Sequence, residues 1–296
     1  MFKEIFRFPQ HNEVQGCCYK CNVTPAGIRA TGSDAPWRSP DARLDHWKLI
    51  QRLIANGLII NALFGLPFFN AELIFRIDWM HATDLGVGAD FVGQLFVHLI
   101  EKMPGANIQH RLNALWHRIL AGYERHVTES KLDNLTLAML KYGKPTSPKL
   151  KAHAAEVRGL IPIARDLVEL LLDDADPIDH TVKMAMVSLS ACYDCLSADH
   201  PSPNAFKDHS RRFASLFVAL EQRTTTFGIR PKLHMFQELC EMTVGSRPAA
   251  HWTYRDEDFG GSLVALAKKR GGKTIPKTIG CRVLSKFMAR HKVPWL

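Results

Sequence analysis

Two cysteines in the segment GCCYKCNVTP have a spacing that suits a metal ion. Cys18 and Cys21 form a C-x-x-C pair, and the tight turn of such a pair aims two thiolates at one tetrahedral zinc ion. Two more ligands are needed, and no second C-x-x-C and no H-x-x-x-H follows. Three nearby residues are candidates for them: Cys17, His11 and His46. We therefore expect either a structural zinc site or a loop of free thiols.

A second candidate site is an aspartate in the segment LIFRIDWMHATDLGVG. Residues 73 to 78 are mostly apolar or β-branched and end on Asp78, a pattern that predicts a buried β-strand. His81 follows three residues later, and two glycines then open a helix. A carboxylate on such a rigid platform can bind Mg²⁺, which prefers oxygen ligands. On these residues alone, the simpler alternative is that Asp78 caps the following helix.

A third group of chemically useful residues is the acidic triplet Asp256, Glu257 and Asp258 in the segment HWTYRDEDFGG. The residues that follow have helical periodicity, so the triplet stands at the expected start of a helix. Carboxylates are favoured there by the helix dipole even without any chemistry to perform. Spacing alone therefore favours a capping role.

Positive charge is concentrated at the end of the sequence. The chain has 38 Lys and Arg against 29 Asp and Glu, a formal net charge of +9. Nine of the basic residues and none of the acidic ones lie after residue 258, so the preceding part is formally neutral. Such a local basic field attracts polyanions, nucleic acid first, and the alternative is a solvated, solubilising tail. The candidate DNA-contacting residues are Lys268, Lys269, Arg270, Lys273 and Lys277.

The elements that must position these residues are mostly helices. We expect one compact body with attachments: extended residues 1 to 9, a loop to residue 45, a helix from there to Gly57, the strand, and an almost wholly helical remainder. Residues 141 to 153, with Gly143 and two prolines, are the best internal linker. The later helices are predicted at about 84–102, 107–128, 131–141, 152–175, 179–197, 204–224, 231–242, 254–270 and 278–290.

Several classes of function and location are unsupported by the sequence. It contains no phosphate-binding G-x-x-x-x-G-K-[ST] or G-x-G-x-x-G loop, no G-x-S-x-G and no H-E-x-x-H. No run of about 18 apolar residues predicts a membrane span, and MFKEIFRFPQ lacks the order of a secretory signal. The seven cysteines do not form a disulfide framework. We therefore expect an intracellular protein in a reducing compartment.

The order of these motifs resembles that of DDE/D DNA transposases of the CACTA and Plavaka kind, including diverged transposon-derived proteins. The resemblance is carried by D-W-M-H-x-x-D-L-G at residues 78 to 86, a long helical insertion, P-K-L-H at 231 to 234 and the acidic triplet. It implies an α+β, predominantly α fold, with an incomplete RNase H-like core and a large all-helical insertion. It also implies a nuclear protein that binds DNA and not membranes.

Carried over residue by residue, the resemblance matches Asp78 to the second catalytic acid of that family, in its D-x-x-H setting with His81. Glu257 best matches the third acid, and Asp258 and Asp256 are the alternates. In that family, Mg²⁺ ions held by three carboxylates promote cleavage of DNA and strand transfer. The family also has a cysteine-bearing insertion, which would correspond to the zinc loop.

The first acid is where the sequence departs from the family. The family's opening strands and their acid do not fit before Pro9, and Glu4 is a poor substitute because FKEIF looks like the tail of an element. We therefore expect an N-terminally truncated chain that binds DNA without cutting it.

The implied division is a cysteine loop at 1–45, a helix and the acid-bearing strand at 46–103, a helical insertion at 104–230, and C-terminal helices with the basic tail at 231–296. One alternative function is a non-catalytic DNA-binding or scaffold remnant. Another is a zinc-stabilised helical interaction module.

Overall fold

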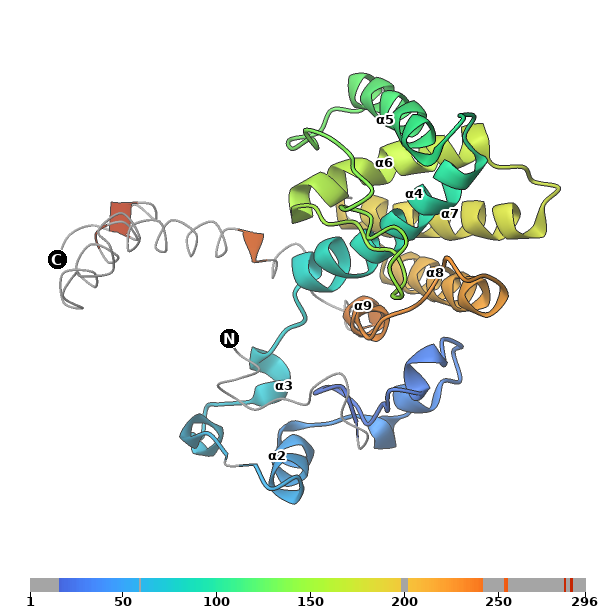
Figure 1. Ribbon diagram of the computed structural model, residues 1–296. Helices are drawn as coiled ribbons and strands as arrows, with labels where there is room; N and C mark the ends of the chain where they lie inside the picture. The colour runs from blue at the N-terminus through green and yellow to red at the C-terminus, as the bar shows by residue number, and fades with distance from the viewer. Residues whose placement is uncertain are drawn as a thin grey trace. The chain divides into compact units, whose positions relative to one another are not determined.

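A computed structural model describes residues 16–58, 60–197 and 202–241, together with residues 253, 254, 285, 288 and 289. The chain divides into two compact units, Met1–His251 and Trp252–Leu296. All elements named below belong to the first unit (Figure 1). The predicted extended segment at 1–9 lies outside the described residues, and so do most residues of the predicted helices 254–270 and 278–290.

The first part of this unit, residues 16 to 78, is here called the N-terminal lobe and consists of short elements. Its bounds are η1 Gly27–Arg29, η2 Pro36–Arg38, η3 Pro40–Ala42, α2 His46–Ala55, η4 Ala62–Gly65 and α3 Ala71–Ile74. Helix α2 begins where it does because the Asp45 side chain accepts a hydrogen bond from the Lys48 backbone N–H at 2.8 Å. One small core lies beneath α2 and α3, and a second lies around the cysteines.

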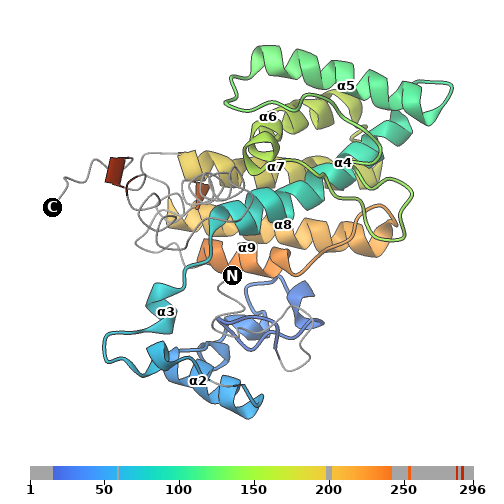
Figure 2. The same ribbon diagram turned by 60° about the vertical axis from the view of Figure 1, so that its left-hand side comes forward.

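The second part is a helical body. It comprises the wide turn η5 Met80–Gly88 and the helices α4 Ala89–Lys102, α5 Ile108–Arg125, α6 Ala154–Leu171, α7 Pro177–Ser197, α8 Pro203–Arg223 and α9 Lys232–Glu241. Every residue of α4 from Ala89 to Ile100 is buried, so α4 is the central helix of the body. In both ribbon views, α9 lies on the side of the body next to the N-terminal lobe (Figures 1 and 2).

Two buried carboxylates fix α4 against its neighbours. Asp90 pairs with Arg230 at 2.7 Å and with Lys149 at 3.1 Å, which ties the start of α4 to the segments before α6 and α9. Asp179 on α7 pairs with other side chains of α4, His98 and Lys102. Burial opposes ionisation of Asp179, but the hydrogen bonds from these partners outweigh it and lower the pKa of the carboxyl. Removal of one partner from such a buried pair typically costs about 3–5 kcal/mol.

Most of the predicted helices within the described residues are confirmed, with ends shifted by a few residues. Two predictions are wrong. Residues 131 to 141 form irregular turns rather than a helix, and Lys141 at their end has a positive φ of 53°, which a helix does not tolerate. Residues 73 to 78 do not form a strand. Helix α3 continues to Ile74, and the rest of that segment is an extended connection.

The extended connection shows why the strand prediction failed. Phe75 and Ile77 are buried and Arg76 between them is exposed, so the segment has the two-residue period of a strand. No strand lies beside it among the described residues, in which the only bridge is an isolated one between Cys21 and Arg43. The predominantly helical class is therefore confirmed, whereas the described residues contain no sheet of an RNase H-like core. None of their helices has the length and apolarity to cross a bilayer.

Gly93 provides a test of the packing around α4. A Cβ atom added there would lie 2.6 Å from the carbonyl carbon of Lys149 and would also meet the Leu150 backbone nitrogen. Leu150 is held at this place because its N–H donates to the Ala89 carbonyl at 3.0 Å. We expect Gly93→Ala to lower the free energy of unfolding by about 1–3 kcal/mol, although alanine normally favours a helix.

The measurement for this prediction is urea unfolding of purified variants. Gly65→Ala is the matched control, because a Cβ at Gly65 has open space around it. Equal stabilities of the two variants would contradict the close approach of residues 149 and 150 to α4.

Candidate metal centre

The C-x-x-C segment forms a buried turn whose backbone is held from several sides. The Lys20 N–H donates to Cys18 Sγ at 3.3 Å, within the turn itself. The Arg52 guanidinium on α2 donates to the carbonyl oxygens of Cys18 and Cys21, at 2.9 and 3.2 Å, and to that of Gly16. Cys18 and Cys21 are 1% and 0% exposed. The turn therefore presents two thiols to the protein interior in a fixed orientation.

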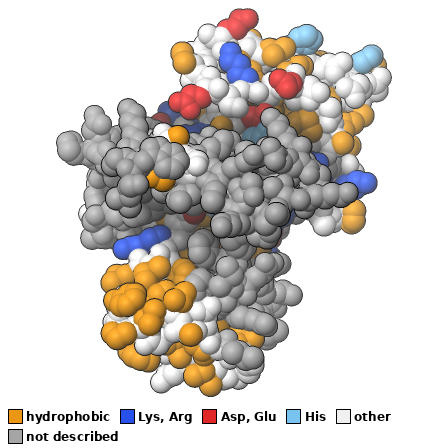
Figure 3. Space-filling view, turned by 90° about the vertical axis from the view of Figure 1, so that its left-hand side faces the viewer, with side chains coloured by type: hydrophobic (Ala, Val, Ile, Leu, Met, Phe, Trp, Pro, Cys, Tyr) orange, Lys and Arg blue, Asp and Glu red, His pale blue; other side chains and the backbone are white. Residues whose placement is uncertain are grey.

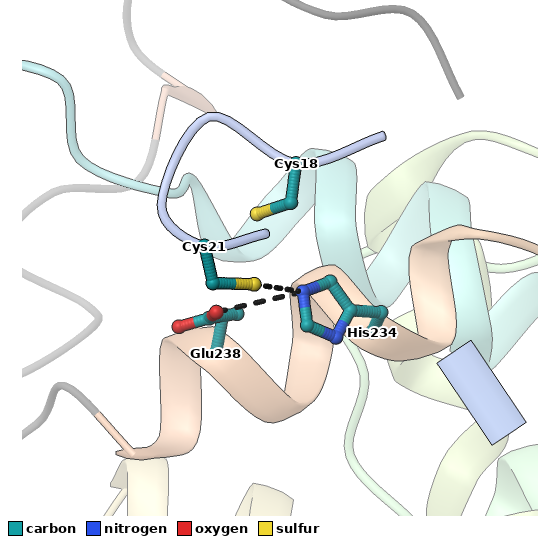
Figure 4. Close-up of side chains that lie close together, drawn as sticks. All are labelled: Cys18, Cys21, His234 and Glu238. Carbon is teal, nitrogen blue, oxygen red and sulfur yellow. Dashed lines mark hydrogen bonds and ion pairs between the residues drawn. The ribbon is translucent and has the colours of Figure 1, made fainter. Parts of the chain in front are cut away.

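Helix α9 brings two further donors to the same place. His234 and Glu238 are four residues apart, so their side chains lie on one face of the helix. Both are almost fully buried, at 1% and 0% exposed. Figure 4 shows the Cys21 thiol and the Glu238 carboxylate facing the same nitrogen of the His234 ring, with the Cys18 thiol nearby. Four potential ligands from two distant segments thus meet in one group.

The spacing of these atoms fits a tetrahedral ion. One donor atom from each of Cys18, Cys21, His234 and Glu238 lies within 4.8 Å of all the others. His234 Nε2 is 3.2 Å from Cys21 Sγ and 3.4 Å from Glu238 Oε1. A tetrahedral zinc site with bonds of about 2.0–2.3 Å has edges of about 3.3–3.8 Å, so these two separations match and any pair near the 4.8 Å limit would have to approach by about 1 Å. Two sulfurs, one imidazole nitrogen and one carboxylate oxygen are ligands that zinc accepts.

The same group is electrostatically prepared for a cation. Burial opposes ionisation of Cys18, but hydrogen bonds from Cys21 and His234 outweigh it and lower the pKa of the Cys18 thiol to about 5. Burial also opposes ionisation of Glu238, yet His234 and Arg43 lower the pKa of its carboxyl to about 2. The pKa of Cys21 is raised, first by its hydrogen bond to Cys18 and then by burial. At neutral pH these shifts favour the ionised forms of Cys18 and Glu238.

Arg43 completes the charge balance of the centre. Its Nη1 donates to both oxygens of Glu238, at 2.8 and 2.6 Å, from the loop that precedes α2. Zn²⁺ with two thiolates and one carboxylate has a net charge of −1, and the guanidinium neutralises it. Because a buried net charge is costly, Arg43 suits the occupied form of the site.

Two of the zinc ligands predicted from the sequence belong to this group, and the other described candidates do not. Cys18 and Cys21 are members of the group, whereas the neighbouring Cys17 thiol donates to the Val23 carbonyl at 3.4 Å. His46 Nδ1 accepts a hydrogen bond from the Ala71 N–H at 3.2 Å, in the other small core of the lobe. His11 lies outside the described residues.

His234 and Glu238 were not among the ligands expected from the sequence. The available signal was their i, i+4 spacing just after P-K-L, two potential ligands on one face of a predicted helix. Cys21 and His234 are 213 residues apart, so no local pattern joins the two segments.

The structure describes only part of the predicted Mg²⁺ site. Asp78 Oδ2 accepts a hydrogen bond from the His81 backbone N–H at 2.8 Å and lies 2.6 Å from His81 Nδ1. This is the geometry of a side chain that caps a helical turn. Asp256, Glu257 and Asp258 lie outside the described residues, and so do the basic residues Lys268 to Lys277. The expected convergence of Asp78 with a late acid therefore stays a prediction.

Comparison of this chain with protein-family models, with curated proteins and with solved structures found no match.

A zinc analysis tests the centre. We expect purified protein to contain about one equivalent of zinc, because the four donors form a closed tetrahedral site. Cys18→Ser should remove most of the zinc, and a chelator should lower the thermal stability of the wild-type protein. Cys17→Ser is the matched control, since this adjacent buried thiol lies outside the group. Less than about a tenth of an equivalent, with a fold that survives chelation, would contradict the assignment.

Acid titration tests the role of Glu238 in the metal-free protein. A carboxyl with a lowered pKa contributes stability that is complete above its ordinary value of 4.5 and is lost as the pH falls toward about 2. We expect wild-type protein to lose on the order of 3 kcal/mol relative to Glu238→Gln over this interval. The measurement is urea unfolding at several pH values after chelation. Parallel stability curves for the two proteins would contradict the buried Glu238 ion pairs.

Proposed function

We propose that this chain is a transposase-derived DNA-binding protein built around a structural zinc centre, and that it does not cut DNA. The observation that carries the zinc centre is the group of Cys18, Cys21, His234 and Glu238. These residues join the loop that precedes the helical insertion to the helix that follows it. The zinc ion would hold the two flanks of the insertion together.

The composition of the group supports a structural rather than a catalytic metal. Structural zinc sites use four protein ligands, whereas catalytic sites leave one position open for water or substrate. Here four protein donors are available, and all four residues are buried. A substrate phosphate would have no route to such an ion.

The local contacts of Asp78 support a capping role for this residue. Metal-dependent phosphoryl transfer needs several carboxylates that converge on two ions about 4 Å apart. Asp78 instead accepts hydrogen bonds within its own turn, and the segment before it is an extended connection. The resemblance matches no residue convincingly to the first acid.

DNA binding is proposed from the charge of the sequence. All of the net positive charge belongs to the segment after residue 258, which holds nine basic and no acidic residues. Phosphate contacts need only such side chains and give a largely sequence-independent affinity. We assign the contacts to Lys268, Lys269, Arg270, Lys273 and Lys277.

The salt dependence of binding to duplex DNA tests this assignment. Replacement of Lys268, Lys269 and Arg270 by alanine should lower the slope of log affinity against log salt by up to about three units, if each contacts a phosphate. The matched control replaces three exposed lysines of the described part: Lys141, Lys144 and Lys151. Fluorescence anisotropy over a range of salt concentrations measures both slopes. A larger loss in the control variant would contradict the assignment.

A nicking assay tests the absence of cleavage. We expect labelled duplex DNA to stay intact when it is incubated with the purified protein and Mg²⁺ or Mn²⁺, because the resemblance supplies only two of the three carboxylates that hold the metal ions. Asp78→Ala should bind DNA with nearly unchanged affinity. Nicking by the wild-type protein that vanishes in Asp78→Ala would refute the proposal and show that the acid set is complete.

A further inference from the structure

The side chain of Arg52 lies against the main chain of the cysteine turn. Its guanidinium donates to the carbonyl oxygens of Cys18 at 2.9 Å and Cys21 at 3.2 Å, and also to that of Gly16. A guanidinium is a planar fork with five N–H groups in fixed directions, whereas a lysine ammonium is a compact point charge. One side chain therefore fixes the peptide groups of both cysteine ligands.

Gly16 allows the guanidinium to come this close. Its φ of 140° lies in the region that favours glycine, and a Cβ atom added there would lie 2.7 Å from Arg52 Cζ. Any side chain at this position would therefore have to displace the guanidinium. The segment that leads into the turn leaves space for Arg52.

The backbone bonds of the turn act on other atoms than Arg52 does. The Cys17 N–H donates to the Val23 carbonyl at 2.8 Å and closes the base of the loop. This bond does not involve the carbonyl groups of the two cysteine ligands, to which Arg52 donates. Within the turn, the Lys20 N–H donates to Cys18 Sγ at 3.3 Å. The orientation of these peptide groups thus also determines a hydrogen bond to a ligand sulfur, of the kind that tunes metal sites.

Helix α2 gives Arg52 a firm base. Leu49 and Leu53 on the inner side of the helix are 2% and 1% exposed and belong to the first small core. Figure 3 shows hydrophobic side chains gathered over the outside of the lobe. The ten residues of α2 include no Asp or Glu. The helix itself therefore has no carboxylate that would compete with the turn for the guanidinium.

We propose that Arg52 is a positioning residue of the zinc centre and sets its affinity for the ion. The inference rests on the zinc centre of the proposed function. Arg52 holds the C-x-x-C turn in its ligating conformation before zinc arrives, so the ion does not have to order the turn. Such pre-organisation raises affinity because less conformational entropy is lost on binding.

The role of Arg52 differs from that of Arg43. Arg43 binds the carboxylate of Glu238, a ligand on the α9 side of the centre. Arg52 binds only the main chain of the cysteine side in the contacts described above, so it acts through geometry rather than through the charge of a ligand. The two arginines thus orient the two halves of the site.

Zinc affinity of the full chain tests the proposal, measured by competition with a chelator at one fixed pH because protons compete for the ligands. Arg52→Met should bind zinc about 10–100-fold more weakly, the usual effect of losing an outer-shell partner. Arg52→Lys keeps the charge without the fork, so it should recover only part of this loss. The matched control is Arg76→Met, an exposed arginine of the same lobe whose charge reaches Lys20 in the turn. It should bind zinc like the wild-type protein.

Hydrogen exchange of the metal-free protein separates positioning from a general loss of stability. The Lys20 amide should exchange about tenfold faster in Arg52→Met than in the wild-type protein, whereas amides of α4 should keep their rates. A merely structural role would lower the stability of the metal-free and zinc-bound forms alike, and would leave zinc affinity unchanged.

Three results would overturn the positioning role and leave the zinc centre standing: wild-type affinity in Arg52→Met, full recovery in Arg52→Lys, or an equal loss in Arg76→Met. Faster exchange throughout α4 in Arg52→Met would also overturn it. A wild-type protein that binds no zinc would instead refute the centre itself, and this inference with it.

Discussion

Two thiols, an imidazole and a carboxylate meet in the interior of this protein, and such polar groups are costly to bury without partners. Their contacts bring Cys18 and Cys21, in a loop, against His234 and Glu238 on α9. In the metal-free protein, hydrogen bonds within the group offset part of this cost. Burial lowers the pKa of the His234 imidazole, but its hydrogen bonds to Cys18 and Glu238 outweigh burial and raise that pKa to about 9. A zinc ion would satisfy the group more completely, with each donor bound directly. The position of the N-terminal lobe depends on this junction.

Ion pairs around the junction reinforce the same contact. Arg43 binds Glu238, and Arg38 binds Glu241 one turn further along α9. The lobe needs such support because residues 16 to 78 form only short elements around two small cores. Small units of this kind commonly depend on a bound metal or a disulfide for stability.

The sequence predicted the helical body better than it predicted the site. Helices such as α6 have continuous apolar stripes and clear ends, and a periodic pattern of that length is a strong local signal. Residues 73 to 78 show what a local pattern cannot decide, because a short apolar run is equally compatible with a strand, a helix end and a buried connection. The sequence alone showed the C-x-x-C pair, which supplies two of the four potential zinc ligands. The other half depends on which face of α9 meets the lobe, a tertiary contact over more than two hundred residues that no local spacing encodes.

The central claim is that one zinc ion joins the loop to α9, and X-ray absorption at the zinc edge of the purified protein tests it most directly. The account predicts two sulfur ligands at about 2.3 Å and two nitrogen or oxygen ligands at about 2.0–2.2 Å. In His234→Ala, the nitrogen contribution to this shell should fall while both sulfurs stay. A shell of four sulfurs, or of oxygen and nitrogen alone, would contradict the account, because the Cys18, Cys21, His234 and Glu238 group cannot supply either.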